Sequence, residues 1–324
     1  MFEFIKDRFA AVTHSNVAHF TLPSVVYEIQ PGFVAGARID GSGRQKRKIR
    51  GISVQPIKAE TVGPHLSHAN VADAADLRRA ADTVLAAVGN GGGRYGLIVP
   101  DGAVRVAILS FEALPDDPLE AEALVRWRMK DKLPYNPEEA RATFQVLSRE
   151  PQHVEVLAVA VRTSVLAEYE SAFSSVNGGA ALILPSAVAL LPLLSETDMR
   201  GQLLLHVCSN WLTAVVVAGS RPCVWRTREL DPNDLESHAR EAASEAMRVL
   251  ASARDRLQAD LGHAVLSMRP LPGRELAAAV SSAIGHKVDL ISTSSELTGL
   301  LTVDDRAVFD QFGAALAGVA ANVG

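Results

Sequence analysis

The feature that most constrains the fold is a pattern of strands and helices that occurs twice along the chain. The segment VYEIQPGFVAGARID, Val26 to Asp40, reads as two short strands joined at a Gln-Pro-Gly corner, and helices alternate with strands after it. The second half opens in the same way with the apolar runs QLLLHV and WLTAVVVAG. Strands that alternate with helical patterns are typical of α/β domains, so the sequence predicts two α/β halves.

The apolar periodicity predicts the individual elements within this frame. Apolar residues at intervals of three and four indicate helices, whereas alternating or continuous short apolar runs indicate strands. We expect helices at residues 72–88, 119–133, 164–175, 185–194, 231–262, 274–284 and 305–321. Besides the hairpins, we expect strands at residues 49–57, 95–100, 103–111, 142–147, 154–162, 180–184, 222–230, 263–267 and 287–291.

The composition limits the classes of partner and compartment. A chain of 324 residues that is 48% hydrophobic is long enough for two cores of ordinary size. Its net charge of −5 gives no electrostatic footprint for nucleic acid. The two cysteines, Cys208 and Cys223, form no CxxC pair, which excludes a cysteine-rich zinc module. Because no apolar run is long enough to cross a bilayer, we expect a cytosolic protein.

Three stretches of the first half carry a resemblance to a known family. They are Leu97 to Pro115, Glu122 to Leu147 and Val154 to Phe173, and the second contains an Arg-Trp pair that runs into Leu-Pro-Tyr. In order, spacing and chemistry they resemble the type IV pilus assembly protein PilM family, as do the helices LPSAVALLPLL and FGAALAGVA. The resemblance covers nearly the whole chain beyond the first twenty or so residues.

The resemblance implies an α/β, actin-like fold made of duplicated RNase H-like halves, similar to the cell-division protein FtsA. On this basis we expect an N-terminal arm at residues 1–20, first-half parts at 21–95 and 163–198, and a small inserted subdomain at 96–162. The second half would take residues 199–324. Members of the family carry a further lobe there, and residues 230–263 are predicted to hold one helix and little else.

Members of this family usually bind ATP through two phosphate-binding hairpins and an adenosine-binding segment. In the first hairpin, Gln30 stands where the family has a glycine that lets phosphate approach the backbone. Pro31 and Gly32 follow, and Pro31 has no amide hydrogen to donate. Phe33 replaces a hydroxyl, and Glu28 keeps the charge of the family's aspartate.

The second hairpin and the adenosine-binding segment are altered as well. By the resemblance, the carboxylate position falls on His206, the glycine falls on Cys208, and Ser209 follows in the turn. Met268 and Arg269 take glycine positions of the adenosine-binding segment. Together with the reduced lobe, these changes predict that ATP binding has been lost, that the protein has no cofactor and that it is not an enzyme.

Other candidate residues carry weaker signals. His65 and His68 form an H-x-x-H pair, but no nearby Asp, Glu or Cys completes a metal site. We expect solvated loop histidines and no metal. Cys208 lies two residues after His206 on an apolar strand, where a core cysteine is the usual finding. Trp127 lies at the edge of the apolar stripe of its helix, so we expect it in the core, with anchoring of a partner as the alternative.

The resemblance implies a non-catalytic cytosolic scaffold of the type IV pilus machinery. Such a protein would bind the cytoplasmic N-terminal tail of the inner-membrane protein PilN and link it to the cytosolic motor ATPase, and it would reach the membrane only through partners. Arg126 and Trp127 are the candidate contacts with a partner, and a homo-oligomer is compatible with the sequence. Two alternatives remain: an active ATPase on the same fold, and a GspL-like cytoplasmic component of a type II secretion system.

Overall fold

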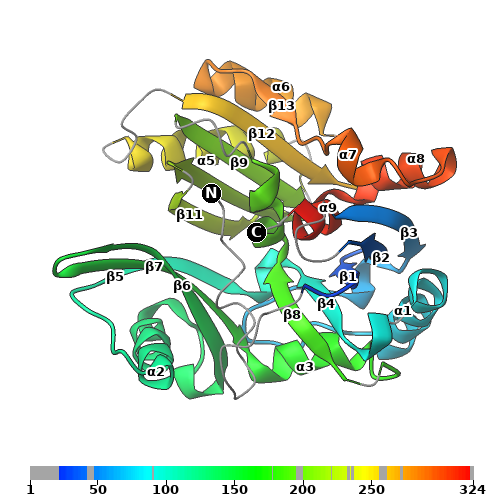
Figure 1. Ribbon diagram of the computed structural model, residues 1–324. Helices are drawn as coiled ribbons and strands as arrows, with labels where there is room; N and C mark the ends of the chain where they lie inside the picture. Colours follow the sequence, from blue (N-terminus) through cyan, green and yellow to red (C-terminus); the bar gives the residue numbers. More distant parts are fainter. Residues whose placement is uncertain are drawn as a thin grey trace.

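A computed structural model describes residues 22–41, 47–89, 91–176, 178–194, 200–219, 221–231, 234, 237–254, 261–270 and 273–321. These residues form two five-stranded sheets and one three-stranded sheet (Figure 1). The arm predicted at residues 1–20 lies outside the described residues. Short 3-10 helices lie at Ala59–Thr61, Gly91–Gly93, Asp101–Ala103, Lys130–Lys132, Pro137–Glu139 and Leu191–Leu193.

The first half is built on a five-stranded sheet in the order β3-β2-β1-β4-β8. Its strands are β1 (Val25–Gln30), β2 (Phe33–Asp40), β3 (Lys48–Pro56), β4 (Tyr95–Val99) and β8 (Ala180–Pro185). The first three strands are antiparallel neighbours, whereas β4 and β8 join in parallel. Every residue of β1 is buried, as expected for the central strand of a sheet that is covered on both faces.

The helices of the first half are α1 (Ala74–Val88), α3 (Thr163–Ser171) and the short α4 (Ser186–Leu190). The side chain of Asp73 starts α1 by accepting hydrogen bonds from the backbone N–H groups of Ala75 and Asp76. Gly89 ends the helix with a positive φ of 87°, a conformation that glycine adopts without a steric penalty. Buried Leu77, Ala81 and Val84 of α1 belong to the core of the first half.

The second half repeats the strand order of the first. Its strands are β9 (Gly201–Cys208), β10 (Trp211–Ala218), β11 (Arg221–Glu229), β12 (Leu261–Arg269) and β13 (Val288–Leu290). They form a sheet in the order β11-β10-β9-β12-β13, again with three antiparallel strands followed by two parallel ones. The helices α5 (Ser237–Ala253) and α6 (Arg274–Ile284) contribute apolar residues to its core. The chain is therefore a duplicated α/β structure.

A small subdomain is inserted into the first half between β4 and α3. It contains β5 (Arg105–Phe111), α2 (Pro118–Arg128), β6 (Ala140–Glu150) and β7 (His153–Arg162). The three strands form an antiparallel sheet in the order β5-β7-β6. One face of this sheet packs against α2 in a separate core, while Leu157, Val159 and Val161 on the other face join the core of the first half. The sheet therefore lies between α2 and the main body.

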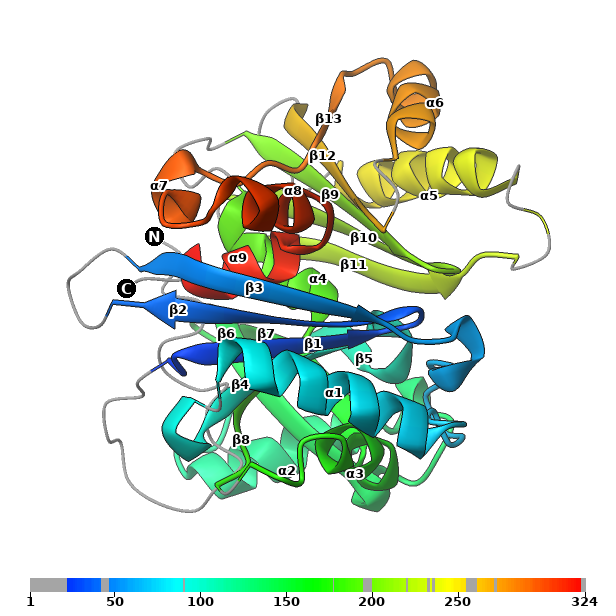
Figure 2. The ribbon, with the colours of Figure 1, turned by 90° about the vertical axis from the view of Figure 1, so that its right-hand side faces the viewer.

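The chain returns to the first half through α7 (Ser295–Thr298), α8 (Val303–Phe312) and α9 (Ala314–Ala321). Figure 2 shows α9 between the two halves, beside α4. Leu316 and Val319 of α9 are fully buried in the core of the first half. A Cβ atom on Gly318 would lie 1.7 Å from the carbonyl oxygen of Ala189 in α4. Only glycine permits the two helices to approach so closely.

The structure corrects several of the predicted boundaries. The inserted subdomain does not start at residue 96, because β4 pairs in parallel with β1 through Gly96 and Val26 and so belongs to the sheet of the first half. The helix predicted at 231–262 is described as α5 only over Ser237–Ala253, and Leu261 already begins β12. Pro232, in the first turn of the predicted helix, lies outside the described residues.

Two further helices are shorter than their apolar periodicity predicts. The helix predicted at 305–321 is broken into α8 and α9 at Gly313, where a Cβ atom would lie 2.3 Å from the ring of Phe309. The helix predicted at 119–133 has its α-helical part at Pro118–Arg128 and continues as a 3-10 turn. Among the described residues, no helix is both long and apolar enough to span a membrane.

Candidate functional site

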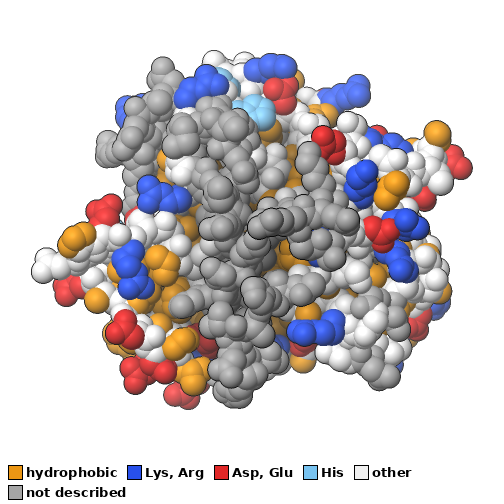
Figure 3. All heavy atoms as spheres, viewed as in Figure 1, with side chains coloured by type: hydrophobic (Ala, Val, Ile, Leu, Met, Phe, Trp, Pro, Cys, Tyr) orange, Lys and Arg blue, Asp and Glu red, His pale blue; other side chains and the backbone are white. Residues whose placement is uncertain are grey.

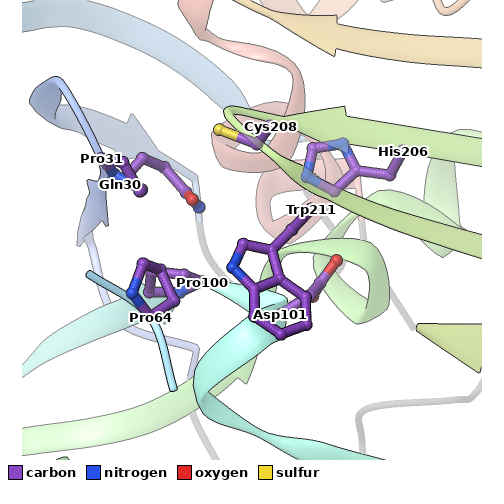
Figure 4. Close-up of a pocket in the computed structure, with 8 residues that line it drawn as sticks. All are labelled: Gln30, Pro31, Pro64, Pro100, Asp101, His206, Cys208 and Trp211. Carbon is purple, nitrogen blue, oxygen red and sulfur yellow. The ribbon is translucent and has the colours of Figure 1, made fainter. Parts of the chain in front are cut away.

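The turns of the two hairpins and the loop after β4 meet between the halves of the molecule. The turn between β1 and β2 comes from the first half, and the turn between β9 and β10 comes from the second. Figure 4 shows a small cavity at this junction, with side chains arriving from both halves. It encloses about 10 Å³ and is lined by Gln30, Pro31, Pro64, Pro100, Asp101, His206, Cys208 and Trp211. This volume has room for about one water molecule.

A buried ion pair joins the two halves beside this cavity. Nη1 of Arg269, at the end of β12, donates a hydrogen bond to Oε2 of Glu28 on β1 over 2.6 Å. The two side chains are only 2% and 0% exposed. Burial acts to lower the pKa of Arg269, but the charge and hydrogen bond of Glu28, together with Cys208 and Asp101, outweigh it and the pKa is raised. Each charge therefore compensates the other in a site with no access to water.

Gln30 satisfies the second oxygen of Glu28. Its Nε2 donates to Oε1 of Glu28 over 2.9 Å and also to Oγ of Ser186 at the start of α4. Ser186 in turn donates to the carbonyl oxygen of Val99 over 3.2 Å. The carboxamide of Gln30 thus occupies the space that a glycine would leave free. The polar side chains of the first hairpin, Glu28 and Gln30, make their hydrogen bonds to other groups of the protein.

His206 extends the network on the side of the second half. Its Nδ1 lies 3.3 Å from both the carbonyl oxygen and the hydroxyl oxygen of Ser267, and its Nε2 lies 3.4 Å from Nη2 of Arg269. Burial, and secondarily the positive charge of Arg269, hold the pKa of His206 well below its usual value. A neutral ring with its proton on Nδ1 donates to Ser267 and accepts from Arg269.

Asp101 forms a second polar link between the halves. Its Oδ1 accepts a hydrogen bond from the backbone N–H of Ala187 over 3.0 Å, and its Oδ2 accepts one from the hydroxyl of Thr213 on β10 over 2.9 Å. Burial is the main cause that raises the pKa of Asp101 to about 6, although both hydrogen bonds act in the opposite direction. Asp101 is therefore a buried carboxyl group that is held by both halves.

Trp211 closes the junction from the second half. A Cβ atom on Gly102 would lie 2.3 Å from Cε2 of Trp211, so the indole ring packs directly on the backbone of the loop after β4. On the other side, the ring of Phe33 packs edge to face on Phe312 with centroids 5.0 Å apart. The guanidinium carbon of Arg269 lies 5.9 Å from the centroid of Phe33. The ring of Phe33 therefore lies beside the ion pair, and Phe312 packs on that ring.

The remaining residues of the altered motifs have structural roles. Gly32 has a φ of 90° in the first turn, and Ser209 has a φ of 54° at an exposed position of the second turn. Met268 is half-buried and packs on the core of the second half. Burial raises the pKa of the Cys208 thiol to about 12, so the sulfur stays protonated at neutral pH. A protonated, buried thiol is a core residue and a poor nucleophile.

The structure brings together most of the residues that the sequence marked as altered nucleotide positions, and it adds Asp101. Asp101 was not among the site residues predicted from the sequence. A usable signal was present, because Asp101 follows the end of a buried strand, and the carboxyl ends of parallel strands are where α/β sheets place functional groups. Nothing in the sequence indicated that its partner would be Thr213.

The other candidates lie away from this junction. The rings of His65 and His68 stack with centroids 4.1 Å apart, and Nδ1 of His65 accepts hydrogen bonds from the backbone N–H groups of Ser67 and His68. Within the described ranges, no group of three or more His, Cys, Asp or Glu side chains could hold a metal ion. These contacts stabilise the conformation of the loop that contains the two histidines.

The expectation that Trp127 lies in the core is wrong. Its side chain is 55% exposed, with Nζ of Lys130 4.3 Å above the ring centroid. The buried residues of α2 are Ala121 and Val125, and Trp127 lies on the opposite face of the helix because two residues correspond to about 200° of rotation. Arg126 is half-buried.

Replacing Asp101 with asparagine is expected to change how stability depends on pH. Because the folded-state pKa of Asp101 is raised from 3.8 to about 6, its contribution to stability is fully present below about pH 4 and is lost as the pH rises through about 6. Asp101→Asn removes this titration and should flatten the profile by up to about 2–3 kcal/mol. Urea unfolding measured across this range checks the result, with exposed Asp116→Asn as control. An unchanged slope in Asp101→Asn would contradict the assignment.

The comparisons with known proteins identify a fold class. No protein-family model matches the sequence, and a search of curated proteins finds no match. Solved structures do match, and they define the class as the actin-like ATPase fold. The duplicated strand order described above agrees with this class, so the predicted fold is confirmed.

One particular structure is similar over almost the whole chain. It is the PilM-PilN type IV pilus biogenesis complex, which is 18% identical, has a TM-score of 0.72, and covers 94% of this chain and 99% of that chain. A second structure, from Bacteroides thetaiotaomicron, is described as a protein with actin-like ATPase fold and unknown function. It is 7% identical at a TM-score of 0.51 and covers 90% of this chain and 96% of that chain. At these identities the similarity is one of fold.

Proposed function

We propose that this protein is a non-catalytic scaffold of a type IV pilus assembly machine. The observation that carries the proposal is the filled junction between the halves. Glu28 and Arg269 form an ion pair at positions where, by the family resemblance, a nucleotide-binding hairpin and the adenosine-binding segment would lie. Trp211 packs on Gly102 at the same junction and lines its small cavity. Because side chains of the protein itself fill this cleft, we propose that no nucleotide binds there.

The size of the cavity supports the same conclusion. Sites for small molecules usually have volumes of about 300–1,000 Å³, whereas the junction encloses about 10 Å³. A nucleotide would have to separate the halves and break a buried ion pair, which leaves both charges uncompensated. The free energy needed to separate the halves would cancel much of the free energy of nucleotide binding. We therefore propose that the protein neither binds nor hydrolyses ATP.

The unfolding temperature with Mg-ATP is expected to equal that without it. A ligand at a hundred times its dissociation constant stabilises a protein by about 2.7 kcal/mol, which a thermal unfolding scan detects as a shift of several degrees. The scan is made with and without millimolar Mg-ATP, and Mg-ADP serves as a second ligand. A reproducible rise of several degrees with either nucleotide would contradict the loss of binding.

We further propose that the partner is the cytoplasmic tail of a PilN-like inner-membrane protein, since the similar structure is a complex of PilM with PilN. In this proposal the tail docks where the inserted subdomain meets the first half, and the protein links it to the cytosolic motor. β6 is an outer strand of the inserted sheet, and Arg141 of β6 lies 3.5 Å from Glu170 of α3. An extended peptide gains main-chain hydrogen bonds at such a strand edge.

Arg126 and Trp127 are not retained as contacts with the tail. They lie on α2, and the inserted sheet separates α2 from the main body. We expect the contacts with the tail on β6 and on the loop that contains Ser67. The carbonyl oxygen of Ser67 accepts a hydrogen bond from Nη1 of Arg162.

A synthetic peptide of the first dozen or so residues of such a PilN-like tail is expected to bind with a dissociation constant of about 1 μM, near −8 kcal/mol. A flexible tail loses conformational freedom on binding, which keeps the affinity modest. Arg141→Glu should weaken binding at least about tenfold, or 1.4 kcal/mol. Arg240→Glu, an exposed arginine on α5, is the matched control and should have no effect. Absence of binding at millimolar peptide would exclude this partner.

A further inference from the structure

The outer face of α2 carries an exposed apolar ridge. Leu119 and Trp127 are 63% and 55% exposed, and exposed Ala123 lies halfway between them. The three residues are four positions apart, so they form one row on the helix surface. Figure 3 shows hydrophobic side chains next to acidic ones over the lower left of the molecule, where α2 lies in Figure 1. The inner face of the same helix already packs on the inserted sheet.

The charges along this segment are divided between its two ends. The charged residues that precede Ala123 in this segment are acidic, and those that follow it are basic except for Asp131. The acidic residues of the first end are Asp116, Asp117, Glu120 and Glu122, and the basic residues of the second end are Arg126, Arg128, Lys130 and Lys132. A partner that complements this surface must present positive charge to the first end and negative charge to the second. A second copy of the same segment in the antiparallel direction does so.

We infer that the outer face of α2 binds a second copy of this chain, with the two helices antiparallel about a two-fold axis at Ala123. In such an isologous contact each residue meets the residue equally far on the other side of the axis. Leu119 of one copy therefore packs on Trp127 of the other, at both ends of the contact. The small side chain of Ala123 at the centre lets the helix axes approach to about 8 Å.

The charge around the ridge favours a second copy over a membrane surface. Anionic lipid attracts a surface of positive charge, whereas the half of this ridge around Leu119 is flanked by acidic residues. The contact is also small, a single helix face, which lies at the weak end of protein interfaces, below about 1,200 Å². The dimer is therefore transient at low concentration, and a covalent trap is the appropriate test.

The test places one cysteine on the proposed axis. In Ala123→Cys the two new thiols face each other, within reach of a disulfide. In Leu119→Cys alone the two thiols are about 12 Å apart along the helices, at 1.5 Å per residue, which is beyond that reach. Mixing Leu119→Cys with Trp127→Cys chains brings unlike positions together. Ala86→Cys, an exposed alanine on α1, is the matched control for random collision.

Mild oxidation of the full-length variants should give a reducible dimer of Ala123→Cys at least about ten times faster than of Ala86→Cys, with a yield that rises with protein concentration. The Leu119→Cys and Trp127→Cys chains should cross-link when mixed and much less when separate. The parent chain, with buried Cys208 and half-buried Cys223, sets the background. All positions except the background cysteines are exposed, and unchanged thermal unfolding confirms that each variant is folded.

The charges give a second and independent test in the Ala123→Cys background. Glu120→Lys with Glu122→Lys removes the net negative charge of the first end, because only Asp116 and Asp117 remain to balance the two lysines, and should slow cross-linking of that variant with itself. Mixing it with Arg128→Glu and Lys130→Glu chains should restore the rate. Cross-linking of Ala123→Cys no faster than Ala86→Cys, or equal rates for all three ridge positions, would overturn the inference. So would binding of the unmodified chain to anionic vesicles that depends on Trp127.

Discussion

Arg269→Met is expected to destabilise the fold by about 3–5 kcal/mol, because the variant leaves the buried carboxylate of Glu28 without a cation. Glu28 is fully buried, and its remaining hydrogen-bond donor is the neutral carboxamide of Gln30. His206 also loses the donor to its Nε2. The loss is measured as a lower urea concentration at the midpoint of unfolding, with the slope of the transition unchanged.

Two controls separate the charge effect from the loss of packing. Removing both charges in Glu28→Gln with Arg269→Met should recover most of the lost stability, since a neutral pair carries no uncompensated charge. Lys287→Met breaks an ion pair with Asp289 in which the lysine side chain is 81% exposed, and it should cost less than about 1 kcal/mol. If Arg269→Met is no worse than Lys287→Met, the ion pair does not hold the halves together.

Gly318→Val is expected to destabilise the protein by about 3 kcal/mol or more, the upper end for overpacked cores. The atom nearest to the added Cβ is a backbone carbonyl oxygen of Ala189 at 1.7 Å, and a backbone atom in a buried helix cannot turn aside as a side chain does. Gly51→Val on β3 is the matched control, because no atom lies within 4 Å of its added Cβ. We expect a change of less than about 1 kcal/mol there.

The two glycine variants are compared by urea unfolding under the same conditions. If Gly318→Val unfolds at the same midpoint as Gly51→Val, α9 tolerates displacement from α4. Its buried leucine and valine would then contribute little to the core of the first half.

The sequence predicted the two α/β halves because these depend on local signals, whereas the actin-like class was implied by the family resemblance. Apolar runs, turn residues and helix starts are set by neighbours along the chain. The turn of the first hairpin at Pro31 and Gly32 was found in this way. The resemblance also located the altered motifs, since it compares residue types position by position. It did not say what the replacements do.

The contacts of the junction could not be predicted from the sequence. Glu28 and Arg269 are separated by 241 positions, and no local pattern fixes how one half is placed on the other. The errors on helices have a different origin. A spacing of threes and fours continues through Gly313, because a single glycine is tolerated in a helical pattern, whereas the structure divides the segment there into α8 and α9. Trp127 was predicted to be buried for a similar reason. Whether a residue at the edge of an apolar stripe is buried depends on where the neighbouring sheet packs, and the sequence of the helix does not specify that.

The position of α9 has a consequence for the order in which the molecule folds during synthesis. α9 is made after every other described element, yet Leu316 and Val319 fill the core around β1, which is made first. Contacts between such distant parts of a chain form late and slow the folding of a domain. While the ribosome translates the second half, the apolar surface of the first half that α9 later covers is exposed. Nascent chains with such exposed surface aggregate or bind chaperones. The first half therefore becomes a finished domain only when the second half has been made.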